Sequence, residues 1–260
     1  MPAVLALLSA CDQGAGDPAR RAQQAFAAHD YVAARNHVAA ALREQPGNRE
    51  LLQLQARALI ELGDGKGAGD ALVALAGKAA LSGDLAQLAA RAALLRREPE
   101  TVERLLAGNA SPEATRLRAT AALQRGDVDG AAVLFEKAVA EGGNAQAMAD
   151  YARVLLIQGD LAKAERAIHK AEAAAPDDLP VMQTAGDIAL AQDKPGLALA
   201  LYDGANRRYP GNLAVLSGRA RALATLGRKP ELADAVKQLD QLMPGDADVA
   251  ELKAALAAMK

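Results

Sequence analysis

The sequence predicts an all-α protein, a right-handed α-solenoid of antiparallel helix pairs. Three series of residues recur along the chain with one shared spacing, and two of them consist of small residues while the third is bulky. The small series are Ala22, Ala56, Ala119, Ala152, Gly186, Ala220 and Ala34, Ala68, Ala131, Ala164, Ala198, the second closed by Leu232; the bulky series is Val38, Leu72, Phe135, Ile168, Tyr202, Val236. Such a fixed period is typical of stacked helical repeats, in which each unit packs on its neighbours.

The spacing also predicts the number of units. The steps between successive members of each series are 34, 63, 33, 34 and 34. The long step, from Ala56 to Ala119, falls a little short of two full periods. We therefore expect about seven units over residues 15–246, the third of them shortened, with helices near 85–95 and 100–106. A shortened unit changes the angle between its neighbours, so we expect it to bend the array into an N-terminal and a C-terminal segment.

Each predicted element has a local reason. Two antiparallel helices approach closely only where the facing residues are small. Glycines at the turn inside a pair favour the positive φ that often follows a helix end: Gly63, Gly126, Gly159 and Gly227. Prolines end the second helices, because proline lacks the N–H of the next helical bond: Pro46, Pro176, Pro210 and Pro244.

The last segment, 247–260, is predicted to be a capping helix. Asp246 supplies an N-cap, and Val249, Leu252, Leu256 and Met259 form one apolar stripe at helical spacing. We expect this stripe to cover the second helix of the last pair around Leu232, Val236 and Leu239.

The unit at residues 179–212 resembles a tetratricopeptide repeat (TPR). Small residues are followed in order by Ala198, Tyr202, Ala205 and Pro210, which is the TPR order, although Met182 stands where the family has tryptophan. The resemblance extends over residues 15–246 and is weakest at about 81–108. It implies a protein or peptide ligand on a concave face that is lined by the first helix of each pair.

The groove positions of the TPR family fall on eight residues of this chain. They are Gln53, Arg57, Arg116, Thr120, Arg153, Gln183, Asp187 and Arg221. Spaced arginines can bind carboxylates in bidentate fashion, but they are equally typical of solvated helix surfaces. The Lys and Asn set with which some TPR proteins bind chaperone tails is absent at these positions, so a chaperone tail is not the expected ligand.

The N-terminus resembles a bacterial lipoprotein signal. Residues 8–11, Leu-Ser-Ala-Cys, match the lipobox, residues 1–11 would form a truncated signal segment, and residues 12–20 a short polar tether. The resemblance implies a lipid anchor at Cys11 and a periplasm-facing place in the cell envelope. No Lys or Arg precedes Cys11, although signal peptides normally begin with positive charge. Either the true start lies upstream, or the match is accidental and the protein is a soluble cytoplasmic TPR adaptor or regulator.

Other functional classes are not expected. A net charge of −2 and 2% aromatic residues do not suggest a nucleic-acid partner. The glycines at 63–67 lack the spacing of a phosphate loop, and the pair His29-Asp30 has no further ligand nearby, so neither a cofactor nor a metal is predicted. No nucleophile and base stand at a recognisable spacing, so we expect no enzyme and no small-molecule substrate.

The expected function is thus a non-catalytic interaction scaffold. TPR lipoproteins resembling this chain assist the assembly of secretion, pilus, exopolysaccharide or outer-membrane systems. A third, weaker hypothesis is a non-catalytic subunit of an envelope enzyme.

Overall fold

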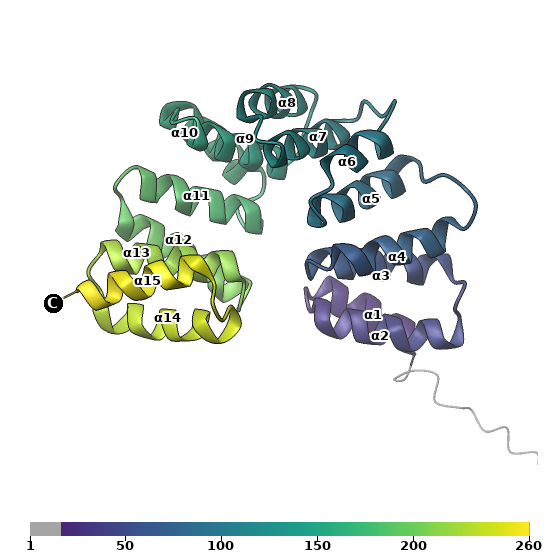
Figure 1. Cartoon of the computed structure of the whole chain (residues 1–260), viewed down its shortest axis with the longest axis horizontal. Helices are drawn as coiled ribbons and strands as arrows, with labels where there is room; N and C mark the ends of the chain where they lie inside the picture. The colour runs from purple at the N-terminus through teal and green to yellow at the C-terminus, as the bar shows by residue number, and fades with distance from the viewer. Residues whose placement is uncertain (1–16, 260) are drawn as a thin grey trace, which may run out of the picture. The chain divides into compact units, whose positions relative to one another are not determined.

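A computed structural model describes residues 17–259 and shows fifteen helices in that part of the chain (Figure 1). The first fourteen form seven antiparallel pairs and the fifteenth stands alone at the C-terminus, which confirms the predicted TPR-like solenoid architecture. The helices are α1 (Pro18–Ala27), α2 (Tyr31–Glu44), α3 (Arg49–Glu61), α4 (Gly65–Ala76), α5 (Gly83–Leu95), α6 (Pro99–Leu105), α7 (Pro112–Gln124), α8 (Val128–Ala140), α9 (Ala145–Ile157), α10 (Leu161–Ala174), α11 (Leu179–Ala191), α12 (Pro195–Arg208), α13 (Leu213–Thr225), α14 (Lys229–Leu242) and α15 (Ala247–Ala258).

The chain divides into two compact units. The N-terminal unit ends at Asn109 and holds α1 to α6, and the C-terminal unit begins at Ala110 and holds α7 to α15. Within each unit, successive pairs stack on one another (Figure 1). The boundary follows the shortened third pair directly. Cys11 and most of the predicted tether lie outside the described residues.

The recurring residues form the core, as their period predicts. Every member of the three series is buried. The third pair also keeps the period, because Ala90, Val102 and Leu106 lie one full period after the corresponding members of the second pair and are fully buried. The first helix and the turn of this pair are therefore of normal length. The missing residues fall at the end of α6, which has only 7 residues.

The turn inside each pair contains one residue with positive φ. Glycine occupies four of these positions, as predicted, but the other three hold His29 (59°), Arg97 (58°) and Asp193 (56°). His29 thus belongs to a tight turn, and the following Asp30 caps α2 by accepting a hydrogen bond from the N–H of Ala33 at 2.9 Å. Turn geometry and helix capping account for the pair His29-Asp30.

Local geometry accounts for the glycines at 63–67: Gly63 has positive φ in the turn, Gly67 lies against the capping carboxylate of Asp64, and Gly65 is closely packed against the third pair. A Cβ atom at Gly65 would lie 2.6 Å from the Cβ of Leu95 in α5. The guanidinium Nη1 of Arg96 donates to the carbonyl oxygen of Gly65 at 2.9 Å, which fixes the start of α4 against the end of α5. The segment therefore serves the contact between the second and third pairs.

The capping helix α15 packs where the sequence predicts. Val249 and Leu252 are buried in one apolar cluster with Leu232, Val236 and Leu239, and Leu256 and Met259 pack against its edge. Two lysines fasten α15 to α14, since Lys253 pairs with Asp240 at 2.6 Å and Lys229 donates to the carbonyl oxygen of Met259 at 2.6 Å. Within residues 17–259, no helix has the length and apolar run that a bilayer crossing requires.

Candidate peptide-binding face

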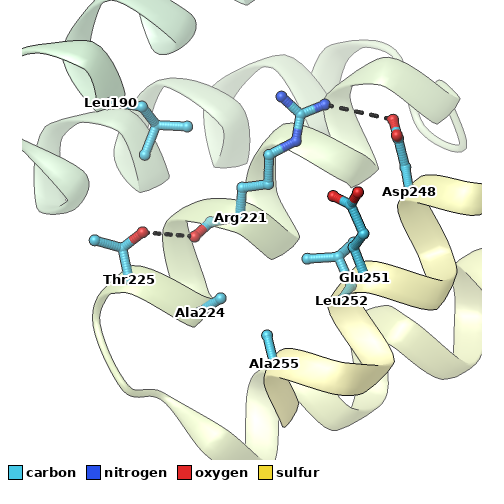
Figure 2. Close-up of a pocket in the computed structure, with 8 residues that line it drawn as sticks. All are labelled: Leu190, Arg221, Ala224, Thr225, Asp248, Glu251, Leu252 and Ala255. Carbon is cyan, nitrogen blue, oxygen red and sulfur yellow. Dashed lines mark hydrogen bonds and ion pairs between the residues drawn. The ribbon is translucent and has the colours of Figure 1, made fainter.

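Helices α9, α11, α13 and α15 lie side by side in the C-terminal unit. We refer to the surface that they form as the first-helix face, because all but α15 are the first helices of their pairs. Its last three helices line an open hollow of about 640 Å³, which we name the α13 hollow (Figure 2). It is lined by Leu190, Arg221, Ala224, Thr225, Asp248, Glu251, Leu252 and Ala255.

The α13 hollow has an apolar part and a charged part. Leu190 and Ala224 lie on one side of it, and α15 on the other side carries the carboxylates of Asp248 and Glu251 together with the small Ala255 (Figure 2). The guanidinium of Arg221 reaches toward the carboxylates, with Nη2 placed 3.9 Å from Oδ2 of Asp248. That distance is too long for a hydrogen bond, so this pair is loose.

A buried tyrosine lies next to the hollow. Tyr202 of α12 is 1% exposed, and its hydroxyl donates to Oδ1 of Asp187 at 2.6 Å. Its ring fits between Gly186 of α11 and Gly218 of α13, where any Cβ atom would collide with it. Burial raises the pKa of Tyr202, the charge of Asp187 raises it further, and the charge of Arg221 opposes them. The hydroxyl therefore stays protonated and holds Asp187 in place.

A second cluster joins α7 to α9. Arg116 is 5% exposed, and its Nε and Nη2 donate to the two carboxylate oxygens of Glu113 at 2.7 Å. Its Nη1 donates to Oδ2 of the buried Asp150 at 2.7 Å, and Arg153 donates to the other oxygen of Asp150 at 2.6 Å. Burial lowers the pKa of Arg116, but the hydrogen bond to Glu113 and the charge of Asp150 outweigh this effect, so the pKa lies above its usual value.

The predicted groove residues therefore fall into different environments. Arg116 is buried and bound to two carboxylates, so its side chain joins adjacent repeats and is withdrawn from any ligand in solution. Thr120 donates to the carbonyl oxygen of Arg116 at 3.1 Å, and the amide of Gln183 donates to the helix-capping Asn212 at 2.9 Å. Only Arg153, among these four predicted residues, keeps an exposed side chain.

The N-terminal unit has a smaller hollow, of about 300 Å³, between α1 and α3. It is lined by Ala19, Gln23, Asn48, Glu50, Leu51, Gln53, Leu54 and Arg57. The guanidinium carbon of Arg57 lies 4.7 Å from the ring centre of Phe26, within the range of a cation–π contact. Predicted residues thus line both hollows: Gln53 and Arg57 in this unit, and Arg221 in the α13 hollow.

Of the eight residues that line the α13 hollow, only Arg221 belonged to the predicted site. The residues that the prediction missed include Leu190 and two acids, Asp248 and Glu251. The two acids stand on the predicted capping helix, away from its apolar stripe, so their exposure could be inferred from the sequence. Their place beside Arg221 depends on how α15 docks against α13, which no spacing reveals. Among residues 17–259, no group of three or more His, Cys, Asp or Glu side chains is placed to hold a metal ion.

Comparisons with known proteins bear on the fold and on part of the sequence. Residues 122–185 match a family model described as tetratricopeptide repeat. A search of curated protein sequences finds no match.

Solved structures resemble the chain at low sequence identity. The APC/C hetero-tetramer Cut9–Hcn1 has a TM-score of 0.69 and 15% identity over 92% of this chain and 48% of its own, so this chain spans about half the length of that relative. A tetratricopeptide repeat protein from Parabacteroides merdae has a TM-score of 0.60 and 18% identity, over 92% and 97% of the two chains. The pilF protein of Pseudomonas aeruginosa has a TM-score of 0.55 and 16% identity, over 79% and 96%. At these identities the likeness concerns the fold.

Proposed function

We propose that this chain, a TPR repeat protein, is a non-catalytic scaffold that binds a segment of a partner protein on the first-helix face of its C-terminal unit. The observation that carries the proposal is the α13 hollow, which lies on the face where TPR proteins are expected to hold peptides. Its volume of about 640 Å³ falls within the range of roughly 300–1,000 Å³ that is usual for ligand sites.

Contacts that involve no ligand hold together the helices that line the hollow. The Lys253–Asp240 pair and the buried side chains of Val249 and Leu252 hold α15 on the last pair. Tyr202 holds α11 and α13 around its ring. A preformed site loses little conformational entropy on binding, which favours affinity for a short segment.

Site-specific photocrosslinking in the native host tests this proposal. A benzophenone amino acid at Thr225, which is exposed and lines the hollow, should form an adduct with one defined partner. The same group at Leu197, which is 52% exposed on the second helix α12, should not form that adduct. Equal adducts at both positions, or adducts at Leu197 alone, would contradict the proposed face.

We further propose that a lipid at Cys11 holds the scaffold in the bacterial cell envelope, facing the periplasm, where it assists assembly of a secretion, pilus, exopolysaccharide or outer-membrane system. The lipobox at residues 8–11 supports this placement. One acyl chain binds a membrane only marginally, so stable anchoring requires the two or three chains of a bacterial lipoprotein.

Fractionation of host cells tests the anchor. The wild-type protein should sediment with membranes, and Cys11→Ser should leave the protein soluble or unprocessed. Recovery of wild-type protein in the soluble fraction with Met1 intact would instead support a cytoplasmic TPR adaptor.

A further inference from the structure

We infer that the α13 hollow selects a partner segment in which a Lys or Arg side chain stands next to an apolar side chain. The inference rests on the proposed function and names the chemistry of its ligand. Three features of the hollow carry it: an excess of negative charge, an accessible carboxylate at Glu251, and an apolar area beside that carboxylate.

Negative charge dominates around Arg221. Its guanidinium lies 3.9 Å from the carboxylate of Asp248, and Glu251 adds a second carboxylate to the lining of the hollow. Arg221 is the one cation among the lining residues, so one cation faces two anions there. An acidic ligand would meet a net repulsion.

Glu251 is the carboxylate that a ligand can reach. No hydrogen bond or ion pair engages it among residues 17–259, and its side chain is exposed. Asp248 lies in the first turn of α15, where an acidic residue also stabilises the helix N-terminus. Glu251 lies beyond that turn, so helix capping does not account for its position at the hollow.

Carboxylates also neutralise two other predicted arginines, Arg153 of α9 and Arg116 of α7. Asp150 binds both of them, and Glu113 also binds Arg116. Because these arginines are already paired, they give little basis for a carboxylate ligand. The structure favours a cationic ligand over the acidic one that the spaced arginines suggested.

The apolar side of the hollow defines the second half of the ligand. Leu190 and Ala224 lie across the hollow from Glu251, and Ala255 lies one turn after Glu251 on the same helix (Figure 2). The methylene stem of a Lys or Arg side chain can lie along such a surface while its charged end reaches the carboxylate. A neighbouring Leu, Ile, Val or Met of the partner would then cover the small side chains Ala224 and Ala255.

The first experiment selects ligands without bias. The full chain is presented to a display library of random dodecapeptides at low salt, and bound sequences are compared with the starting library. Enrichment of Lys or Arg beside an apolar residue supports the inference. Enrichment of acidic or uncharged peptides overturns it and leaves the proposed function standing, whereas selection of no peptide at all counts against the proposed function itself.

The second experiment assigns the charge to its residue. The dissociation constant of one enriched, fluorescein-labelled peptide is measured by anisotropy. We expect Glu251→Gln to weaken binding by about 3-fold, within the range for an exposed ion pair. Glu251→Lys adds a repulsion of similar size and should weaken binding by about 10-fold, and binding should weaken with added salt. Asp234→Asn removes one exposed negative charge from α14, outside the hollow, and should change affinity by less than about 2-fold. Unchanged or tighter binding by Glu251→Lys would overturn the inference.

Discussion

Gly186→Ala should destabilise the C-terminal unit, although alanine is the better helix former. At this position the other pairs carry alanine opposite a smaller bulky residue, such as Ala152 opposite Ile168. Only the pair with Tyr202 has glycine here. A Cβ atom at Gly186 would lie 2.6 Å from Cζ of the tyrosine ring, which is closer than two carbon atoms can approach without displacement.

The structure sets the size of this effect. Overpacking a core costs about 1–3 kcal/mol, and replacing glycine by alanine within a helix returns about 1 kcal/mol. The ring of Tyr202 cannot move aside easily, because Gly218 packs on it from the next pair and its hydroxyl is bound to Asp187 at 2.6 Å. The cost of overpacking should therefore lie toward the upper end of its range, and subtracting the helix gain leaves a net loss of about 1–2 kcal/mol in the free energy of unfolding.

Native-state hydrogen exchange of α11 to α13 is the suitable assay, because repeat arrays unfold locally and one melting temperature averages over their units. Gly196→Ala is the control, since a Cβ atom there meets nothing within 4 Å. This substitution should stabilise α12, because alanine is the better helix former. Equal gains in stability from both glycine substitutions would refute the size-matching argument.

Three further predictions concern stability. Ala198→Leu should cost about 1–3 kcal/mol through overpacking and loosen the last units first by hydrogen exchange; uniform loss across all repeats would contradict it. Truncation after Gly245 should cost roughly 3–6 kcal/mol, the scale of two buried apolar side chains, and cause self-association in light scattering; a stable monomer would show that α15 is dispensable. The pKa of Asp178 in the folded protein lies above its usual 3.8, mainly because of burial; the charge of Asp150 also raises it, and the hydrogen bond from the backbone N–H of Val181 lowers it. The free energy of unfolding should therefore fall as the pH rises from 3.8 through the folded-state pKa. Asp178→Asn keeps the N-cap and should be more stable than wild type at pH 7 but not at pH 3, as measured by urea unfolding; equal stability at both values would refute the sign.

The period of the sequence predicted most of the fold. Small and bulky residues at one spacing are a direct consequence of helix packing, so Ala22 or Tyr202 could be assigned to the core without coordinates. The third pair was harder, because Val102 stands where most other pairs carry alanine. The shortening could be counted from the long step between Ala56 and Ala119, but its place at the end of α6 became visible only with the structure.

The site was less predictable, because it depends on contacts between units of the repeat. Arg116 looks like an exposed helix residue until Asp150 is placed beside it. The two are separated by one full period of the sequence, so a search for opposite charges at that spacing could have paired them. No such spacing in the sequence indicates that Asp248 and Glu251 lie beside Arg221 in the α13 hollow, since both acids come from the capping helix, which lies outside the repeat.

Methyl NMR of the full chain can show directly whether a partner peptide binds in the α13 hollow. Leu, Val and Ile methyl groups are labelled, and the protein is titrated with a peptide from the display selection. We expect the methyl signals of Leu190 and Leu252, which line the α13 hollow, to shift in proportion to bound peptide. The signals of Val133 and Leu197, which are exposed on second helices of the same unit, should stay in place. Shifts at Val133 and Leu197 without shifts at Leu190 and Leu252 would show that the partner binds elsewhere.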